Sequence, residues 1–180
     1  MKKIPTIFDR DWHGDRSRVT RDHNPEAAWV FADEGTATKK IDGTSCAIIG
    51  GRFYKRLEVR AGKPVPADFL VSTHDTETHK VTGWIPVGQG PEDQYHREAL
   101  APDLPNGTYE LVGPKIQGNP ENLERHELIN HASLGLADNV PTDFDNLREW
   151  LSDKDMEGVV WHHPDGRMAK IKKRDFGQDR

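Results

Sequence analysis

Cysteine, long apolar runs and an excess of positive charge are scarce or missing in this chain of 180 residues. The single cysteine, Cys46, excludes an internal disulfide and a cysteine-rich zinc site. No apolar run is long enough to span a membrane, and the start Met1-Lys2-Lys3 is not followed by the apolar stretch of a signal peptide. These absences predict a soluble, cytoplasmic protein.

The low hydrophobic content places much of the chain at the surface or in polar clefts. Hydrophobic residues make up 34% and charged residues 31%, yet five tryptophans and several apolar runs argue against disorder. The formal net charge of −5 excludes a general attraction to nucleic acid, so phosphate binding would depend on a local basic cluster. A chain of this length is most economically one domain with its own core.

Short apolar runs separated by turn residues predict an α+β fold with mostly antiparallel sheets. Gly50-Gly51 joins two of these runs and is a strong hairpin signal. Pro164-Asp165-Gly166 has the turn chemistry for a second hairpin near the end of the chain. Strands are expected at residues 44–49, 53–59, 108–113, 157–161 and 168–172.

Two helices are expected between these strands. Asn119-Pro120 places a proline at a first helical position and predicts a short helix to about residue 128. Apolar residues at helical spacing predict a clearer helix over 143–153, which Thr142 would cap. The segments predicted to be loops are 61–80 and 88–106.

The most informative local feature is the pattern K-x-D-G in Lys40-Ile41-Asp42-Gly43. A lysine attacks a nucleotide phosphate only after it loses a proton, and the pKa of a free lysine is about 10.4. Surrounding cations or burial must therefore lower that pKa. Taken alone, the pattern also fits an ordinary turn with solvated lysines.

Basic residues lie on two of the predicted strands. Alternation places Arg56 and Arg60 on one face of a strand, where cross-strand ion pairs are an equally good explanation. Lys170 and Lys172 share one face of the last strand, with Ile171 on the other. Such lysines also protect an exposed strand edge.

Two glutamates stand next to apolar runs. Glu110 follows Tyr109 in a predicted strand, and Glu157 precedes the apolar residues of another. Tyr109 fits a buried core residue as well as a ligand contact. Glu157 fits a helix-to-strand linker as well as a site residue.

The order of these features resembles the motif series of covalent nucleotidyltransferases, the superfamily of ATP-dependent polynucleotide ligases and RNA-capping enzymes. Longer strings extend the resemblance to the 5′–3′ RNA ligase family, whose members include a small vertebrate enzyme. Together the matches span roughly residues 36–175. The strings are Gly83-Trp84-Ile85-Pro86-Val87, Glu110-Leu111-Val112-Gly113, Gln117-Gly118-Asn119-Pro120 and Glu157-Gly158-Val159-Val160-Trp161-His162 with Asp165-Gly166.

This resemblance implies an adenylyltransferase fold, with flanking helices and a nucleotide cleft between the sheets. It implies an ATP-dependent RNA ligase that joins RNA 5′-phosphate and 3′-hydroxyl ends through a covalent Lys40–AMP intermediate and an adenylylated RNA 5′ end. The residues it implies for nucleotide binding are Lys39, Lys40, Ile41, Arg56, Arg60, Tyr109, Glu110, Glu157, Lys170 and Lys172.

Within this set, Lys40, Glu157, Lys170 and Lys172 would be catalytic. The charges of Lys170 and Lys172 would bind the α-phosphate and lower the pKa of Lys40. Glu157 and Glu110 would hold ribose hydroxyls or a Mg²⁺ or Mn²⁺ ion.

Three other residues of the implied nucleotide-binding set have specific expected roles. Arg56 would be a bidentate donor to phosphate or ribose, and Tyr109 would stack on the adenine unless it is a core residue. Lys39 stands where related ligases often carry an acidic residue, so it adds a cation beside the nucleophile. The K-x-D-G spacing nevertheless selects Lys40.

The expected organisation is a single minimal domain over 1–180, with a polar segment 1–35 before a catalytic core 36–175. DNA ligases and GTP-dependent capping enzymes usually add an OB-fold domain, for which 180 residues leave no room. Both remain alternatives, as does a non-catalytic RNA- or nucleotide-binding module. A monomer with weak, salt-sensitive RNA binding is expected. Candidate RNA contacts are Arg10, Arg16, Arg18, Arg21 and Lys172-Lys173-Arg174.

Overall fold

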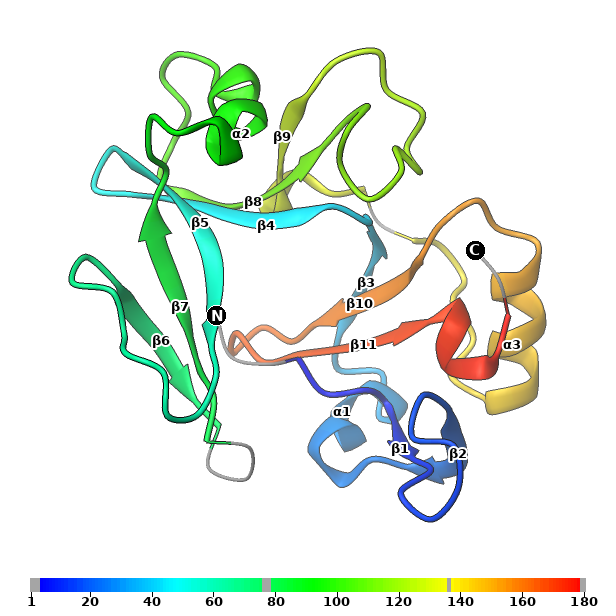
Figure 1. The fold of residues 1–180 in the computed structure, drawn as a ribbon. Coiled ribbons are helices and arrows are strands. Elements are labelled where there is room, and N and C mark those ends of the chain that lie inside the picture. The colour runs from blue at the N-terminus through cyan, green and yellow to red at the C-terminus, as the bar shows by residue number, and fades with distance from the viewer. Residues whose placement is uncertain (1–3, 76–78, 136, 179–180) are drawn as a thin grey trace. The chain divides into compact units, whose positions relative to one another are not determined.

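The computed structural model describes residues 4–75, 79–135 and 137–178, and shows an α+β fold built mostly from antiparallel strands (Figure 1). The expectation for Met1-Lys2-Lys3 therefore lies outside the described residues. Contacts divide the chain into two compact units. The central unit is Asp42–Leu134, and the terminal unit combines Ile4–Ile41 with Gly135–Arg180.

The central unit is built on an antiparallel sheet, which has six strands within the described residues. Its strand order is β6-β7-β5-β4-β8-β9. The strands are β4 (Thr44–Ile49), β5 (Arg52–Val59), β6 (Leu70–His74), β7 (Val81–Pro86), β8 (Gly107–Val112) and β9 (Glu127–Asn130), and the helix is α2 (Gln94–Ala99).

The hairpin predicted at Gly50-Gly51 is confirmed. These glycines have φ of 58° and 74°, and they connect the paired residues Ile49 and Arg52 of β4 and β5. Positive φ at both central residues is the requirement of a two-residue hairpin turn, and glycine meets it without steric cost.

Other predictions for the central unit were wrong. Strand β6 lies inside the predicted loop 61–80, and α2 lies inside the predicted loop 88–106. Residues 119–128 form no helix, because the Asn119 side chain binds both the N–H and the carbonyl of Leu123 at 3.0 and 2.9 Å. Asparagine often stabilises such turns by bonding nearby backbone.

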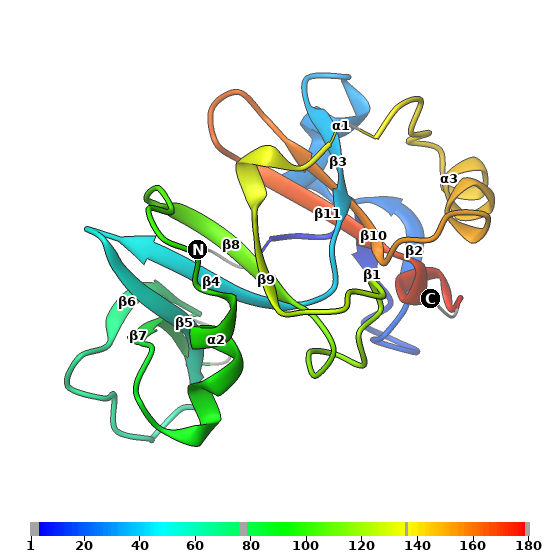
Figure 2. The ribbon, with the colours of Figure 1, turned by 90° about the horizontal axis from the view of Figure 1, so that it is seen from above.

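The terminal unit contains a three-stranded antiparallel sheet in the order β11-β10-β3 and a two-stranded sheet β1-β2, as drawn in Figure 2. Both strands predicted near the end of the chain are confirmed. The strands are β1 (Phe8–Arg10), β2 (Val19–His23), β3 (Thr36–Lys40), β10 (Gly158–His162) and β11 (Met168–Lys172), and the helices are α1 (Ala28–Phe31) and α3 (Phe144–Ser152).

Helix α3 confirms the prediction over 143–153 but not its cap. Asp143, rather than Thr142, is the N-cap, and its carboxylate accepts hydrogen bonds from the N–H groups of Asp145 and Asn146. Leu147 and Leu151 of α3 are fully buried in the core of the terminal unit, and Phe144 and Trp150 pack against this core partly buried.

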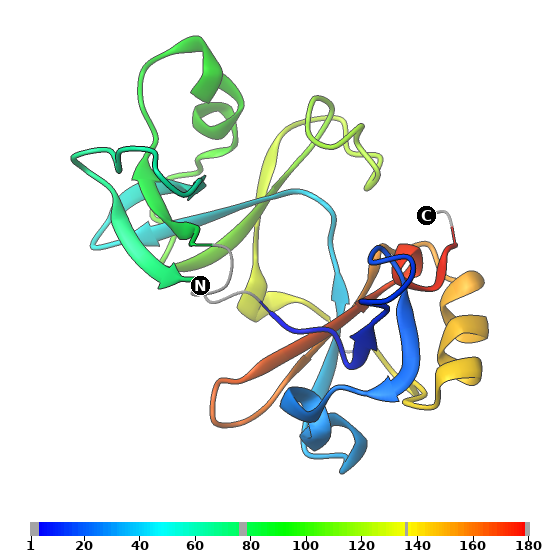
Figure 3. The same cartoon turned by 60° about the horizontal axis from the view of Figure 1, so that its bottom comes forward.

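The prediction that 1–35 is a polar segment outside the catalytic core was wrong for the described residues. Ile7 and Phe8 are fully buried, and Trp29 and Val30 join them in the core cluster. The backbone of Thr6 also forms a parallel bridge with Lys170 of β11, so the start of the chain runs beside this strand (Figure 3). The segment is therefore part of the terminal unit.

No helix in the described part of the chain is both long enough and apolar enough to cross a membrane.

Candidate active site

Three lysines share one face of the sheet in the terminal unit. Gly158 of β10 pairs with Lys40 of β3 on one side and Lys172 of β11 on the other, and Val160 pairs with Lys170. Directly paired residues of antiparallel strands point to the same face. The opposite face carries the buried residues Val159, Ala169 and Ile171, which confirms the predicted orientation of Lys170 and Lys172.

Glycine at position 158 is required by the close approach of β11. A Cβ atom there would lie 2.0 Å from the carbonyl oxygen of Ile171 and 2.8 Å from Cα of Lys172. A larger residue would therefore separate the two strands and move Lys172 away from its neighbours.

Glu157 links two of the lysines. Lys40 Nζ donates to Glu157 Oε2 at 2.5 Å, and Lys172 Nζ forms an ion pair with Glu157 Oε1. The three side chains are only 19%, 9% and 12% exposed for Lys40, Glu157 and Lys172. Burial raises the pKa of Glu157, but the nearby charges of Lys40 and Lys172 outweigh it and lower the pKa below its ordinary value.

Of the three lysines on this face, Lys170 is the one whose positive charge is least stabilised by its surroundings. Burial, followed by the charges of Lys172 and Lys40, lowers the pKa of Lys170 to about 8. Among the described residues, no hydrogen bond or ion pair involves its ammonium group. Three ammonium groups therefore accompany one carboxylate, and this lysine face has the electrostatics of an anion site.

Lys39 and Lys40 point to opposite faces of β3. Lys39 pairs with Val159, whose side chain belongs to the core face, whereas Lys40 pairs with Gly158. Ile41 is buried at 8% exposure, and its carbonyl accepts from Lys40 Nζ at 3.3 Å. The lysine that the K-x-D-G spacing selects is thus the one on the lysine face.

In the central unit, Glu110 fixes the second half of the K-x-D-G pattern. Its Oε1 atom accepts from the backbone N–H of Gly43 at 3.2 Å, and its Oε2 atom is 3.0 Å from Nε2 of His131. Nδ1 of His131 lies 3.0 Å from the Thr108 hydroxyl. Because a carboxylate only accepts, His131 donates to Glu110 from Nε2.

His131 was missed by the sequence reasoning. No spacing connects it with Glu110, and it stands just after the end of β9. The pairing of Glu110 with Ile129 places it beside the glutamate, and this register is a tertiary property.

Arg56 shares a face of the central sheet with Glu110. Ser45 pairs with Glu110, and two residues further along β4 Ala47 pairs with Tyr54 of β5. Alternation then places Ser45, Glu110 and Arg56 on the same face. The Ser45 hydroxyl is buried and has no hydrogen-bond partner among the described residues.

Two predicted contacts do not join this row. Tyr109 is 0% exposed on the core face, beside Cys46, and its hydroxyl donates to the Pro105 carbonyl at 2.6 Å. Tyr109 is therefore a core residue, the second of the two interpretations that the sequence allowed, because a ring without exposed surface cannot stack on adenine. Arg60 follows the last residue of β5 and is exposed, so strand alternation does not set its direction.

The two predicted metal ligands are already engaged. Glu157 contacts a lysine through each oxygen, and Glu110 contacts Gly43 and His131. The described residues include no group of three or more His, Cys, Asp or Glu side chains arranged to hold a metal ion. A Mg²⁺ ion held by one or two carboxylates, waters and phosphates needs no such group, but it would displace part of these contacts.

The protein therefore has an α+β fold in which Lys40, Lys170 and Lys172 share one face of a sheet with the Glu157 carboxylate between two of them. Comparison with known proteins connects this chain with RNA ligases. A family model described as RNA ligase 1 matches residues 92–179. RNA ligase 1 of Mus musculus is 28% identical over 68% of this chain, and that of Danio rerio is 27% identical over the same share.

These matches confirm the resemblance to RNA ligases that the motifs indicated. The chain spans 46% of the length of these curated relatives. The segment matched by the family model contains Glu110, Glu157, Lys170 and Lys172, whereas Lys40 precedes it.

Proposed function

We propose that this chain provides the nucleotidyl-transfer centre of an ATP-dependent RNA ligase. The observation that carries the proposal is the lysine face, where the Glu157 carboxylate lies between the ammonium groups of Lys40 and Lys172 and Lys170 is on the same face. Similarity to proteins named RNA ligase 1 supports RNA as the polymer.

In the proposed first step, the neutral Lys40 amine attacks the α-phosphorus of ATP. A phosphorus–nitrogen bond forms, the bond to the bridging β-phosphate oxygen breaks, and pyrophosphate leaves. The ammonium proton of Lys40 is released to solvent water before the attack. Lys170 and Lys172 offset the negative charge of the phosphate, as their position on the same face allows.

The second and third steps use the polymer. The RNA 5′-phosphate attacks the AMP phosphorus and releases Lys40, and a neighbouring 3′-hydroxyl then displaces AMP to form the phosphodiester. A Mg²⁺ or Mn²⁺ ion at Glu157 or Glu110 would supply further positive charge at the phosphates. Glu110 and Arg56, which the sequence resemblance assigns to nucleotide binding, are kept as candidate contacts for the ribose or phosphates.

Transfer of label from ATP tests the first step. The protein is incubated with α-labelled ATP or GTP and Mg²⁺ or Mn²⁺, and label on denatured protein is measured. We expect label from ATP, loss of label in Lys40→Ala, and retention in the matched control Lys39→Ala, whose side chain leaves the other face of β3. Label from GTP alone would indicate a capping-type enzyme, and label from neither would indicate a binding module.

The polymer is tested separately. Nicked and single-stranded substrates with a 5′-phosphate and 3′-hydroxyl are compared as RNA and as DNA, and joined product is measured by electrophoresis. We expect joining of RNA; preferential joining of DNA would reassign the chain to the DNA ligases.

A further inference from the structure

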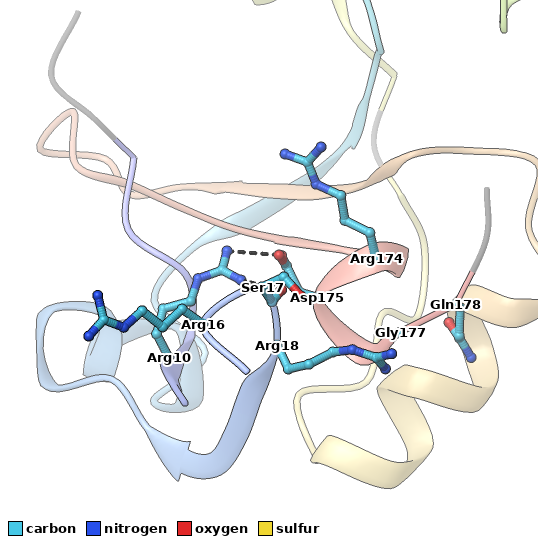
Figure 4. A pocket seen from close by; sticks show the side chains of 8 residues that line it. All are labelled: Arg10, Arg16, Ser17, Arg18, Arg174, Asp175, Gly177 and Gln178. Atoms are coloured by element: carbon cyan, nitrogen blue, oxygen red, sulfur yellow. Dashed lines mark hydrogen bonds and ion pairs between the residues drawn. The ribbon is translucent and has the colours of Figure 1, made fainter. Parts of the chain in front are cut away.

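Several arginines from opposite ends of the sequence surround one pocket in the terminal unit. Its volume is about 490 Å³, and the described residues that line it include Arg10, Arg16, Arg18 and Arg174, with Asp175 as the acidic residue among them (Figure 4). The chain as a whole carries a net charge of −5. This arginine pocket is therefore a local basic site of the kind that the overall charge does not supply.

Part of the arginine pocket is rigidly built. Arg10 Nη2 contacts Asp175 Oδ1 at 2.7 Å, and Arg10 Nη1 donates to the Ser17 carbonyl at 2.9 Å. Arg18 Nη1 donates to the Phe176 carbonyl at 3.1 Å. An arginine has five N–H donors, so these contacts leave others for a ligand.

Gly177 makes room for one of these arginines. It has φ of 79°, and a Cβ atom there would lie 1.1 Å from Nη1 of Arg18. Any other residue at this position would displace the guanidinium, and the left-handed backbone itself favours glycine.

The side chains of the other two arginines in the pocket are available to bind a ligand. Arg16 and Arg174 are exposed, and among the described residues neither side chain makes a hydrogen bond, ion pair or ring contact. Figure 4 shows Arg174 extended away from the Arg10–Asp175 pair. Arg21 differs, because its guanidinium is held by both oxygens of Asp145 at 2.6 and 2.7 Å. Arg21 therefore differs from Arg16 and Arg174 in having an acidic partner within the protein.

The lining favours phosphates over a whole nucleotide. None of the described residues that line the pocket is aromatic, so it offers no stacking surface for a base. Guanidinium groups match phosphate oxygens through paired N–H donors. The lysine face already supplies the cations for the α-phosphate of ATP.

The pocket also adjoins the strand that carries the lysine face. Asp175 is 1% exposed, and its second oxygen accepts from the backbone N–H of Lys172 at 2.8 Å. One carboxylate thus joins Arg10 of the pocket to the end of β11.

We propose that the arginine pocket binds phosphate groups of the RNA strand. This inference rests on the proposed RNA ligase function for its choice of polymer. Its test measures RNA binding without ATP, so the pocket can fail while Lys40 labelling succeeds, and the reverse.

The test variant combines Arg16→Gln with Arg174→Gln, which leaves the Arg10 and Arg18 contacts intact. Arg52→Gln with Arg125→Gln is the matched control, since both are exposed, lie in the central unit and remove the same charge. Affinity for a 5′-phosphorylated single-stranded RNA is measured by fluorescence anisotropy at several salt concentrations. Circular dichroism checks that both variants fold.

We expect the test variant to bind RNA about tenfold more weakly, and the salt dependence of log K to lose about 1.4 in slope, or about 0.7 per contact. The control variant should keep the RNA affinity and the salt-dependence slope of the native chain. A loss confined to 5′-phosphorylated RNA assigns the pocket to the terminal phosphate, and an equal loss with 5′-hydroxyl RNA assigns it to backbone phosphates. Affinity and slope equal to those of the control would overturn the proposal. So would unchanged RNA affinity with slower labelling from ATP, which would assign the pocket to the triphosphate.

Discussion

The two glutamates that the sequence singled out are held in opposite ways. Glu157 in the terminal unit lies between the ammonium groups of Lys40 and Lys172, so charge determines its environment. Glu110 in the central unit is held by a backbone N–H and a histidine ring. The comparison teaches that one carboxylate pairs with two nearly buried cations, whereas the other holds the turn after the lysine through a backbone N–H.

The largest expected effect comes from removing the charge of Glu157. Glu157→Gln leaves two nearly buried ammonium groups without their counter-charge, and we expect the free energy of unfolding to fall by about 3–5 kcal/mol. Urea denaturation measures it. Glu58→Gln is the control, since the Glu58–Lys80 pair is exposed and worth at most about 1 kcal/mol. Equal losses would contradict the electrostatic role of Glu157.

Lowering the pH should gradually remove the contribution of the Glu157 charge to the free energy of unfolding. The pKa of Glu157 is lowered in the folded protein, so its stabilisation is fully present above the unfolded pKa of about 4.3 and disappears as pH falls through the lower, folded value. The stability difference between the native chain and Glu157→Gln should therefore shrink below about pH 4. Denaturation at a series of pH values checks this, and a constant difference would contradict it.

Lys170 should also make stability rise with pH, but in the alkaline range and because its charged form is the one that burial disfavours. Its folded pKa of about 8 lies below the unfolded value, so the unfolded chain binds more protons between about pH 8 and 10.4. This group should raise stability with pH in that range, by at most about 1.4 kcal/mol per pH unit. Lys170→Met should lack the rise and gain stability at pH 7. A matching rise in the variant would assign it to other groups.

The smallest expected effect concerns the support of Glu110. His131→Ala removes one hydrogen bond from Glu110 and one from Thr108, and should cost about 1 kcal/mol of stability. If Glu110 contacts the nucleotide, KM for ATP in the labelling reaction should rise several-fold while the maximal rate changes less. His131→Gln, which can still donate to Glu110, should restore much of KM. Failure of this rescue would leave His131 a structural residue only.

Local chemistry made much of the fold predictable. Gly50-Gly51 and Pro164-Asp165-Gly166 mark turns whose backbone few other residues adopt, and helix α3 has a clear apolar face. The helix predicted at Asn119 was wrong because side-chain bonding to Leu123 competes with helix formation. Strand β6 has exposed residues such as Leu70 and Val71, so it lacks the apolar alternation that would have revealed it.

For the site, the sequence alone determined which residues carry charge and in what order, and strand alternation determined that Lys170 and Lys172 share a face. Only the tertiary structure decided the rest. Register joined Lys40 and Lys172 across Gly158, placed His131 on Glu110 and buried Tyr109 in the core. It also joined Arg10 and Arg174, 164 positions apart, around one pocket. These outcomes depend on which strands pair and at which residues, and local sequence chemistry does not encode that choice by itself.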